Sequence, residues 1–228
     1  MNNYISSNNT LKYDSIRRKI ITYSYESQQG KSLLQKRFGN LKTIHIIAVC
    51  VRLYPAKDIT NFRRNPAFKI AFYIYYDMLE NLLEAKKAVL EICQHKNLLT
   101  IILTEPDTNI QLHTIELINK LYDLFKSINT ALSECEEPLL QIAISADCGY
   151  THFSTSDNTK KNLWLGDVLE RAEILCNNAN NDHYPNLLIS HAIYQQLTKI
   201  EQEYFTKAYY INHIACYGCS AQNITTPS

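Results

Sequence analysis

A histidine and two cysteines near the C-terminal end of the chain have the spacing of metal ligands. His213, Cys216 and Cys219 stand three residues apart, and one imidazole with two thiolates supplies three zinc ligands. A closed structural zinc site needs four ligands, and the sequence holds no second Cys-x-x-Cys motif to complete one. We therefore favour a plain strand and turn with reduced thiols over a metal site in this segment.

The number of glycines argues against the common phosphate-binding loops. The chain of 228 residues has five glycines, where average composition gives about sixteen. Neither G-x-G-x-x-G nor G-x-x-x-x-G-K-[ST] occurs among them. The 23 Lys and Arg residues nearly balance 22 Asp and Glu residues, which is not the charge expected of a nucleic-acid-binding protein. We expect no nucleic-acid partner.

The apolar runs and the cysteines indicate a cytoplasmic protein without a membrane partner. The first residues, MNNYISSNNTLKYD, lack the apolar core of a secretory signal. The longest apolar runs, 98–103 and 139–144, are much shorter than a membrane span. Cys50, Cys93, Cys135 and Cys176 have apolar neighbours in the sequence. This pattern is typical of buried, reduced thiols, and we expect these four to be such thiols.

Any chemistry in this chain must be positioned by alternating strands and helices. The β-branched run over 42–51 predicts a strand in the centre of a sheet covered by helices. Apolar residues three and four apart predict a helix from Phe68 onward and a second helix over 110–131, with a strand over 98–103 between them. The polar segment 1–40 is expected to be an arm with one short amphipathic stretch.

The segment that follows the first helix has two interpretations. The helix either continues to Cys93, which periodicity alone favours, or ends near Lys87. In the second case residues 89–94 begin a strand that turns at 95–97 into the strand over 98–103.

The C-terminal half predicts further strands and helices. Residues 139–145 form a strand, the Asp-Cys-Gly sequence at 147–149 indicates a turn, and residues 150–154 return as a hairpin partner. Asp147 is then a turn residue. Asp167 begins a helix that ends near Asn178, and a strand over 186–190 precedes a short helix over 191–197. The order of elements predicts helices packed on a mixed or antiparallel sheet.

These residues resemble the C-terminal half of a class III nucleotidyl cyclase catalytic domain. The similar string is QIAISADCGYTHFS…NLWLGDVLERAEILCNNAN…NLLISHAIYQQL. The matched positions are Gly149, Gly166, Asp167, Ala172, Leu175, Ile189, Ser190, Tyr194 and Leu197. The layout is similar to that of standalone bacterial cyclases, including the pyrimidine cyclases of antiphage defence.

The resemblance implies an α+β fold. It is a cyclase-like sandwich derived from the ferredoxin-like fold, in which helices flank a central, mostly antiparallel sheet. We expect the cyclase-homology domain over 41–203, the N-terminal arm over 1–40 and a C-terminal extension over 204–228.

The catalytic positions that the resemblance implies are substituted. In that family two carboxylates at neighbouring strand ends hold two metal ions, and an Asn and an Arg come from the partner subunit. The metal positions read Arg52 and Asn97 here, and the Asn and Arg positions read Glu170 and Ile174. An arginine repels Mg²⁺, and a neutral amide is a poor substitute for a carboxylate. The positions that select the base fall near Cys93 and Leu163.

These substitutions favour a pseudoenzyme without a cofactor. It would be a homodimer, or a heterodimer with a cyclase-like chain, that senses a nucleotide or binds a protein. The nucleotide-binding candidates are Arg52, Asn97, Cys93, Leu163 and Asp147. Arg52 would bind a phosphate in place of metal, or else pair with a local carboxylate such as Asp58 or Glu105.

The alternative is an active, divergent nucleotidyl cyclase. It would convert a nucleoside triphosphate to a 3′,5′-cyclic mononucleotide and pyrophosphate, with Mg²⁺ or Mn²⁺ as cofactor. Its metal ligands would be Asp58, Asp107 or Asp147.

Overall fold

We describe the protein from a computed structural model, which defines residues 42–56, 66–84, 88–93, 97–104, 110–155 and 162–224. The chain divides into two compact units, which we describe separately. The larger unit covers 45–149 and 167–228, and the smaller covers 1–44 and 150–166. The predicted N-terminal arm lies outside the described residues.

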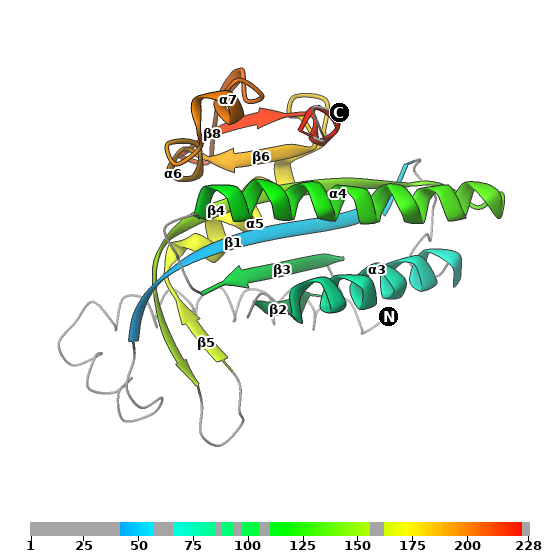
Figure 1. The fold of residues 1–228 in the computed structure, drawn as a ribbon, viewed down its shortest axis with the longest axis horizontal. Coiled ribbons are helices and arrows are strands. Elements are labelled where there is room, and N and C mark those ends of the chain that lie inside the picture. The colour runs from blue at the N-terminus through cyan, green and yellow to red at the C-terminus, as the bar shows by residue number, and fades with distance from the viewer. Residues whose placement is uncertain are drawn as a thin grey trace, which may run out of the picture. The chain divides into compact units, whose positions relative to one another are not determined.

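A mixed sheet is the centre of the larger unit (Figure 1). Its strands follow the order β2-β3-β1-β4-β6-β8-β7. The pairs β1–β3, β2–β3, β6–β8 and β7–β8 are antiparallel, and β4–β6 is parallel. The strands are β1 (Lys42–Pro55), β2 (Val89–Cys93), β3 (Leu98–Leu103), β4 (Leu140–Thr155), β6 (Leu187–Ser190), β7 (Lys207–Ile211) and β8 (Ile214–Cys219). Helices flank this sheet, so the predicted α+β class is confirmed.

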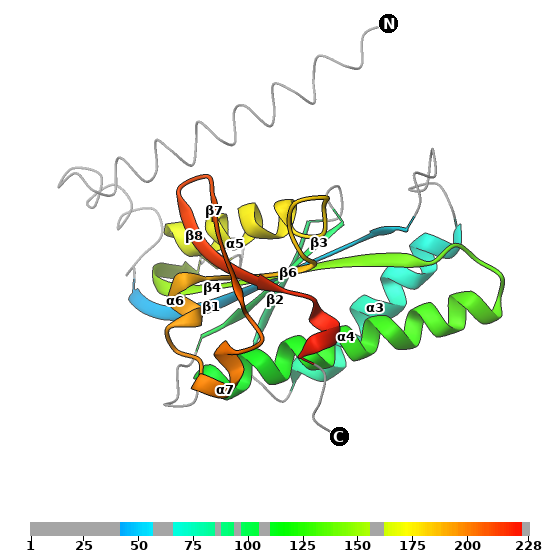
Figure 2. The ribbon, with the colours of Figure 1, turned by 90° about the horizontal axis from the view of Figure 1, so that it is seen from above.

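Helices cover both faces of the sheet (Figure 2). Helices α3 (Pro66–Glu84) and α4 (Ile110–Glu134) lie on one face and α5 (Asp167–Asn178) on the other. The short elements are α6 (His191–Tyr194), α7 (Lys199–Gln202) and η3 (Ala221–Asn223). None of the helices in the described ranges is long and apolar enough to cross a membrane.

The alternation of side chains along β1 explains why both faces are covered. Ile47, Val49, Val51 and Leu53 belong to the apolar core on the side of α3 and α4. Cys50 lies between them in sequence and is equally buried, because successive side chains of a strand point to opposite faces. The predicted central, doubly covered strand is therefore confirmed.

The segment after α3 forms a hairpin. Helix α3 ends at Glu84, and β2 pairs with β3 from Val89 opposite Ile102 to Cys93 opposite Leu98. The interpretation that extended the helix to Cys93, which periodicity favoured, is wrong. Short β-strands and short helical segments can share one apolar pattern, and the pairing with β3 decides between them.

The turn predicted at 147–149 is absent. Strand β4 runs without interruption from Leu140 to Thr155, so residues 150–154 continue it instead of returning beside it. Gly149 has a φ of +155°, which side-chain-bearing residues rarely adopt, and the strand passes through it without reversing. The glycine that indicated a turn is a special conformation inside a strand.

The smaller unit contains the outer end of β4 and β5 (Asn162–Leu165). These strands are antiparallel, from His152 opposite Leu165 to Thr155 opposite Asn162. The rings of Phe153 and Trp164 lie in contact, with centroids 4.5 Å apart. Leu163, a predicted nucleotide-binding candidate, belongs to β5 and is half-buried.

Strands β7 and β8 lie in the segment expected as a C-terminal extension. Through β8, which pairs with β6 from Leu187 opposite Cys219 to Ser190 opposite Cys216, they are strands of the central sheet. Gly218 of β8 pairs with Leu188 of β6 and with Lys207 of β7. An added Cβ there would lie 2.6 Å from Cγ of Pro185 and 2.8 Å from Cδ2 of Leu188.

The close approach at Gly218 predicts a loss of stability in Gly218→Ala. We expect the free energy of unfolding to fall by about 1–3 kcal/mol, because the new methyl group forces buried neighbours apart. Urea unfolding followed by circular dichroism measures the change. Ala215→Ser, at an exposed position of the same strand, should stay within about 0.5 kcal/mol of wild type. Equal stability of the two variants would contradict the packing argument.

Candidate functional site

Two of the predicted site residues lie on neighbouring strands. Arg52 of β1 pairs with Leu98 of β3, and the backbone N–H of Leu53 donates to the carbonyl of Asn97 at 3.4 Å. Leu98 also pairs with Cys93 of β2. Arg52 and Asn97 therefore lie next to each other on the sheet, but β1 continues past Arg52 to Pro55, so Arg52 is not at a strand end.

The guanidinium of Arg52 is held between a helix and an aromatic ring. Nη1 donates to Oδ1 of Asn177 at 3.3 Å, and Cζ lies 5.2 Å from the centroid of the Tyr54 ring, within the range of a cation–π contact. Its Nε is buried without a hydrogen-bond partner among the described residues. Within the described part of the chain, this cation thus donates a hydrogen bond to a neutral amide oxygen.

Tyr54 joins this region to the loop after α5. Its hydroxyl donates to the carbonyl of Asn180 at 3.2 Å, and the Asn180 amide contacts the same hydroxyl and donates to Oε1 of Gln141 at 3.4 Å. Burial raises the pKa of Tyr54, opposed by the Asn180 hydrogen bond. The tyrosine therefore stays neutral and does not offset the charge of Arg52.

One face of α5 carries the remaining predicted positions. Glu170, Ile174 and Asn177 are four and three residues apart, so they lie on the same side of the helix. Glu170 is exposed and Ile174 is half-buried. The opposite side, with Ala172 and Leu175, is buried against the sheet. Sequence reasoning missed Asn177, the member of this stripe that contacts Arg52, and no local signal marked it.

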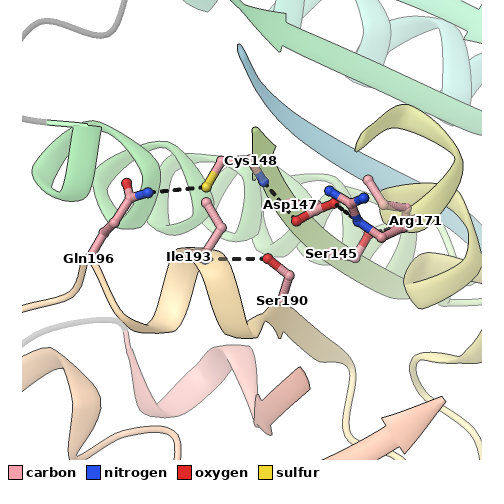
Figure 3. A network of polar contacts seen from close by, with 8 residues as sticks. Ser145, Asp147, Cys148, Arg171, Ser190, Ile193 and Gln196 are labelled. Carbon is pink, nitrogen blue, oxygen red and sulfur yellow. Dashed lines mark hydrogen bonds and ion pairs between the residues drawn. The ribbon is translucent and has the colours of Figure 1, made fainter. Parts of the chain in front are cut away.

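Asp147 is not the turn residue that we expected (Figure 3). Its side chain is 1% exposed, and Oδ2 accepts a hydrogen bond from Nε of Arg171 at 2.7 Å. Oδ1 accepts the N–H of Cys148 at 2.8 Å. The Asp147 carboxylate is therefore paired with Arg171 of α5. The sequence around it offered one signal, the Asp-Cys-Gly motif, and that motif indicated a turn instead.

A second polar contact ties α5 to the same strand. The hydroxyl of Ser145 donates to the carbonyl of Ala172 at 2.6 Å (Figure 3). On the other side of β4, the Gln196 amide donates to Sγ of Cys148 at 3.2 Å. Ser145, Asp147 and Cys148 of β4 therefore hold structural partners.

The residues at the positions where the resemblance implies metal ligands do not fit a divalent metal ion. Mg²⁺ and Mn²⁺ prefer oxygen ligands, above all carboxylates, whereas these positions hold the cationic Arg52 and the neutral Asn97. No group of three His, Cys, Asp or Glu side chains in the described ranges is placed to hold a metal. Three carboxylates that we considered as metal ligands or ion-pair partners lie outside those ranges: Asp58, Glu105 and Asp107.

The three C-terminal metal candidates have separate surroundings. The ring of His213 lies against Tyr210, with centroids 6.2 Å apart, at the turn between β7 and β8. Sγ of Cys216 contacts the carbonyl of Tyr209, and Cys219 packs into the apolar core. Within the described residues they do not gather into a zinc site.

The buried thiols are kept protonated. Burial raises the pKa of Cys50 to about 12, although a hydrogen bond with Thr100 partly opposes the effect. Burial also raises the pKa of Cys176 well above the ordinary value, and that of Cys219 to about 12. Because the thiolate is the nucleophile, none of these three cysteines is suited to covalent chemistry.

Comparison with solved structures assigns the fold. The guanylyl cyclase Cya2 has a TM-score of 0.59 at 9% identity, with 79% of this chain and 95% of that chain covered. The adenylyl cyclase CyaB from P. aeruginosa has a TM-score of 0.53 at 10% identity, with 78% and 94% covered. A bacterial light-regulated adenylyl cyclase has a TM-score of 0.59 at 12% identity, with 94% and 67% covered.

Neither a protein-family model nor a curated protein matches the chain. At 9–12% identity the structural likeness concerns the backbone fold. The chain therefore has the fold of class III nucleotidyl cyclase domains, as the resemblance in the sequence implied.

The difference in burial predicts which thiols react in the native protein. Cys135, which we expected to be buried, is exposed, so that prediction is wrong. At pH 8 this thiol should be alkylated by iodoacetamide within minutes. Cys50 and Cys176 should remain unmodified, because they are buried and because their raised pKa values leave almost no thiolate. Peptide mass spectrometry measures the labelling, with urea-unfolded protein as the control. Equal labelling of Cys50 and Cys135 in the folded state would contradict the structure.

Proposed function

We propose that this chain is a cyclase-fold protein that does not cyclise nucleotides and instead binds a nucleotide phosphate without metal. Arg52 is the residue on which the proposal depends. It occupies the first metal position that the resemblance implies, and it pairs with Leu98, the residue that follows Asn97. Its guanidinium is always charged.

The charge of Arg52 opposes metal binding and favours phosphate. A unit charge at about 4 Å from a divalent ion costs about 8 kcal/mol at an effective dielectric constant of about 20. The same charge attracts a phosphate, whose oxygens match the guanidinium fork. Its present partner is the neutral Asn177 at 3.3 Å, and a charge-assisted bond to phosphate is roughly twice as strong. Replacing Asn177 by a phosphate as the partner of Arg52 would thus be favourable in binding free energy.

The partner-facing half of the expected active site also supports inactivity. The positions for a ribose-binding Asn and a phosphate-binding Arg hold Glu170 and Ile174, which share one face of α5. A carboxylate and an aliphatic side chain cannot supply the donors that a triphosphate requires. A homodimer of this chain would therefore lack both halves of a composite cyclase site.

We further propose that the chain works as a dimer, either with itself or with a cyclase-like chain. Support comes from a structural neighbour: the guanylyl cyclase domain of a fusion protein from Blastocladiella emersonii, with a TM-score of 0.52 at 10% identity, is described as a non-canonical dimer. The α5 face of the sheet, which carries Arg52, is the face that we assign to this partner and to the nucleotide. For nucleotide binding and for dimer formation with a cyclase-like chain, we propose a cytoplasmic location, where nucleotides are available.

The proposal predicts that the purified protein has no cyclase turnover. Incubation with ATP, GTP, CTP or UTP and Mn²⁺, followed by mass spectrometry, should give no 3′,5′-cyclic product, because the metal positions carry Arg52 and Asn97. Turnover that survives repurification and is lost in Asp147→Asn would support the alternative of an active, divergent cyclase.

A gain-of-binding variant gives a matched control for this result. Arg52→Asp combined with Asn97→Asp should acquire Mn²⁺ binding, detected by electron paramagnetic resonance, that wild type lacks. Lys126→Asp combined with Ser127→Asp makes the same change of charge on exposed positions of α4 and should acquire none. Equal Mn²⁺ binding by the two variants would show that the metal positions are misassigned.

Metal-free nucleotide binding is the second prediction. In the presence of EDTA, isothermal titration with the same four nucleotides should give saturable binding for at least one. Arg52→Ala should weaken that binding about tenfold or more, since hydrogen bonds to charged groups contribute about 1.5–3 kcal/mol. Lys126→Ala removes an exposed cation on the other face of the sheet and should change nothing. Binding that is equally strong in Arg52→Ala would refute the proposal.

A further inference from the structure

Helix α5 carries more negative than positive charge where it packs beside Arg52. The helix lies wholly within the described residues, and its charged side chains are those of Asp167, Glu170, Arg171 and Glu173. The charge of Arg171 is already balanced, because its Nε donates to the buried carboxylate of Asp147 at 2.7 Å. Arg52, by contrast, donates to the neutral amide oxygen of Asn177. The helix therefore offers a phosphate on Arg52 no second uncompensated cation.

Glu173 acts on the same place as Arg52. It lies one helical turn before Asn177, the residue of α5 that contacts Arg52, and residues four apart are neighbours on a helix surface. Burial is the main cause of the raised pKa of Cys176, while the charge of Arg52 lowers this pKa and that of Glu173 raises it. Burial also raises the pKa of Cys50 on β1, and Glu173 adds to that increase. The negative charge of Glu173 is therefore felt at the contact between α5 and β1.

A ligand with one negative charge suits this balance of charges. The pair that it forms with Arg52 is electrically neutral, whereas every further negative charge stays uncompensated and is repelled by Glu173. The repulsion between like charges and the cost of removing a charge from water both grow with the charge of the ligand. Glu170, which is exposed on the same side of α5 as Asn177, adds to the repulsion. The charges of α5 therefore select against a chain of phosphates.

The other polar side chains that the structure describes around Arg52 are uncharged. Cζ of Arg52 lies 5.2 Å from the centroid of the Tyr54 ring. The Tyr54 hydroxyl donates to the carbonyl of Asn180, whose amide donates to Oε1 of Gln141. Hydroxyl and carboxamide groups can both donate and accept hydrogen bonds, so they suit a sugar hydroxyl or the edge of a base. They add nothing that balances the charge of a second phosphate.

We propose that the nucleotide bound by Arg52 carries a single phosphodiester with one negative charge, as a cyclic mononucleotide does. This inference rests on the proposed function, because it takes the phosphate to be bound by Arg52. A phosphodiester keeps one negative charge near neutral pH, and its pair with Arg52 is neutral. A phosphate monoester carries a charge of about −1.5 to −2 at pH 7, and a triphosphate carries more. That excess lies near Glu173 without a countercharge from α5.

Isothermal titration with ligands that share a base and differ in charge tests this inference. The probes are the 3′,5′-cyclic, 2′,3′-cyclic, monophosphate and triphosphate forms of adenosine, guanosine, cytidine and uridine. They are titrated in EDTA at one fixed ionic strength, because salt screens charge. For the base that binds, we expect a cyclic form to have a Kd about tenfold or more below that of the triphosphate. The tighter of the two cyclic isomers identifies which phosphodiester the site takes, and either one supports the inference.

The variant Glu173→Gln shows whether charge causes the preference. Without this carboxylate the triphosphate should gain more affinity than the cyclic form, so that the preference narrows about threefold or more. The matched control is Glu134→Gln, at an exposed position of α4 on the other face of the sheet (Figure 2). This control should leave the preference unchanged. Circular dichroism checks that both variants are folded.

The outcomes separate this inference from the proposed function. If the triphosphate binds most tightly and Arg52→Ala weakens its binding, the proposed function stands and the inference is overturned. An unchanged preference in Glu173→Gln also overturns the inference, because charge is then not its cause. If no nucleotide binds, or if Arg52→Ala binds as tightly as wild type, both are overturned.

Discussion

The ion pair between Asp147 and Arg171 determines how α5 sits on the sheet. The Asp147 side chain is 1% exposed, and a carboxylate buried to that extent is stable only with hydrogen bonds and a countercharge. Arg171 supplies the countercharge at 2.7 Å, and the neighbouring backbone N–H of Cys148 supplies a second bond. With the bond between Ser145 and Ala172, the pair connects α5 to the centre of β4. The helix can then reach β1 with its last turn.

The position of that last turn gives Arg52 its environment. Asn177 meets the guanidinium from α5, and Tyr54 lies beneath it on the same strand. An arginine at the C-terminal end of a helix is favourably placed, because the helix macrodipole is negative there. The same cation is unfavourable for a divalent metal. A scaffold with the fold of nucleotidyl cyclases thus holds a permanent positive charge on β1, which attracts a phosphate and repels a metal ion.

The patterns that predicted the fold correctly are those set by local burial. The apolar run of β1 predicted a doubly covered strand, and the 3.6-residue period predicted α4 and α5. Asp147 was mispredicted because Asp-Cys-Gly is typical of turns, while here β4 continues through Gly149. The β2 segment was ambiguous because a short apolar pattern fits either structure, and only the partner strand β3 decides.

The sequence by itself determined the alternation of elements and the resemblance to cyclases, because residue type and spacing are local properties. It also determined that Arg52 and Asn97 stand where that resemblance implies carboxylates. Tertiary structure alone decided that Asp147 pairs with Arg171 and that Asn177 meets Arg52, 125 residues away in the chain. Contacts of that kind depend on which faces of strand and helix come together. The packing of the whole sheet determines which faces meet, and no short stretch of sequence predicts it.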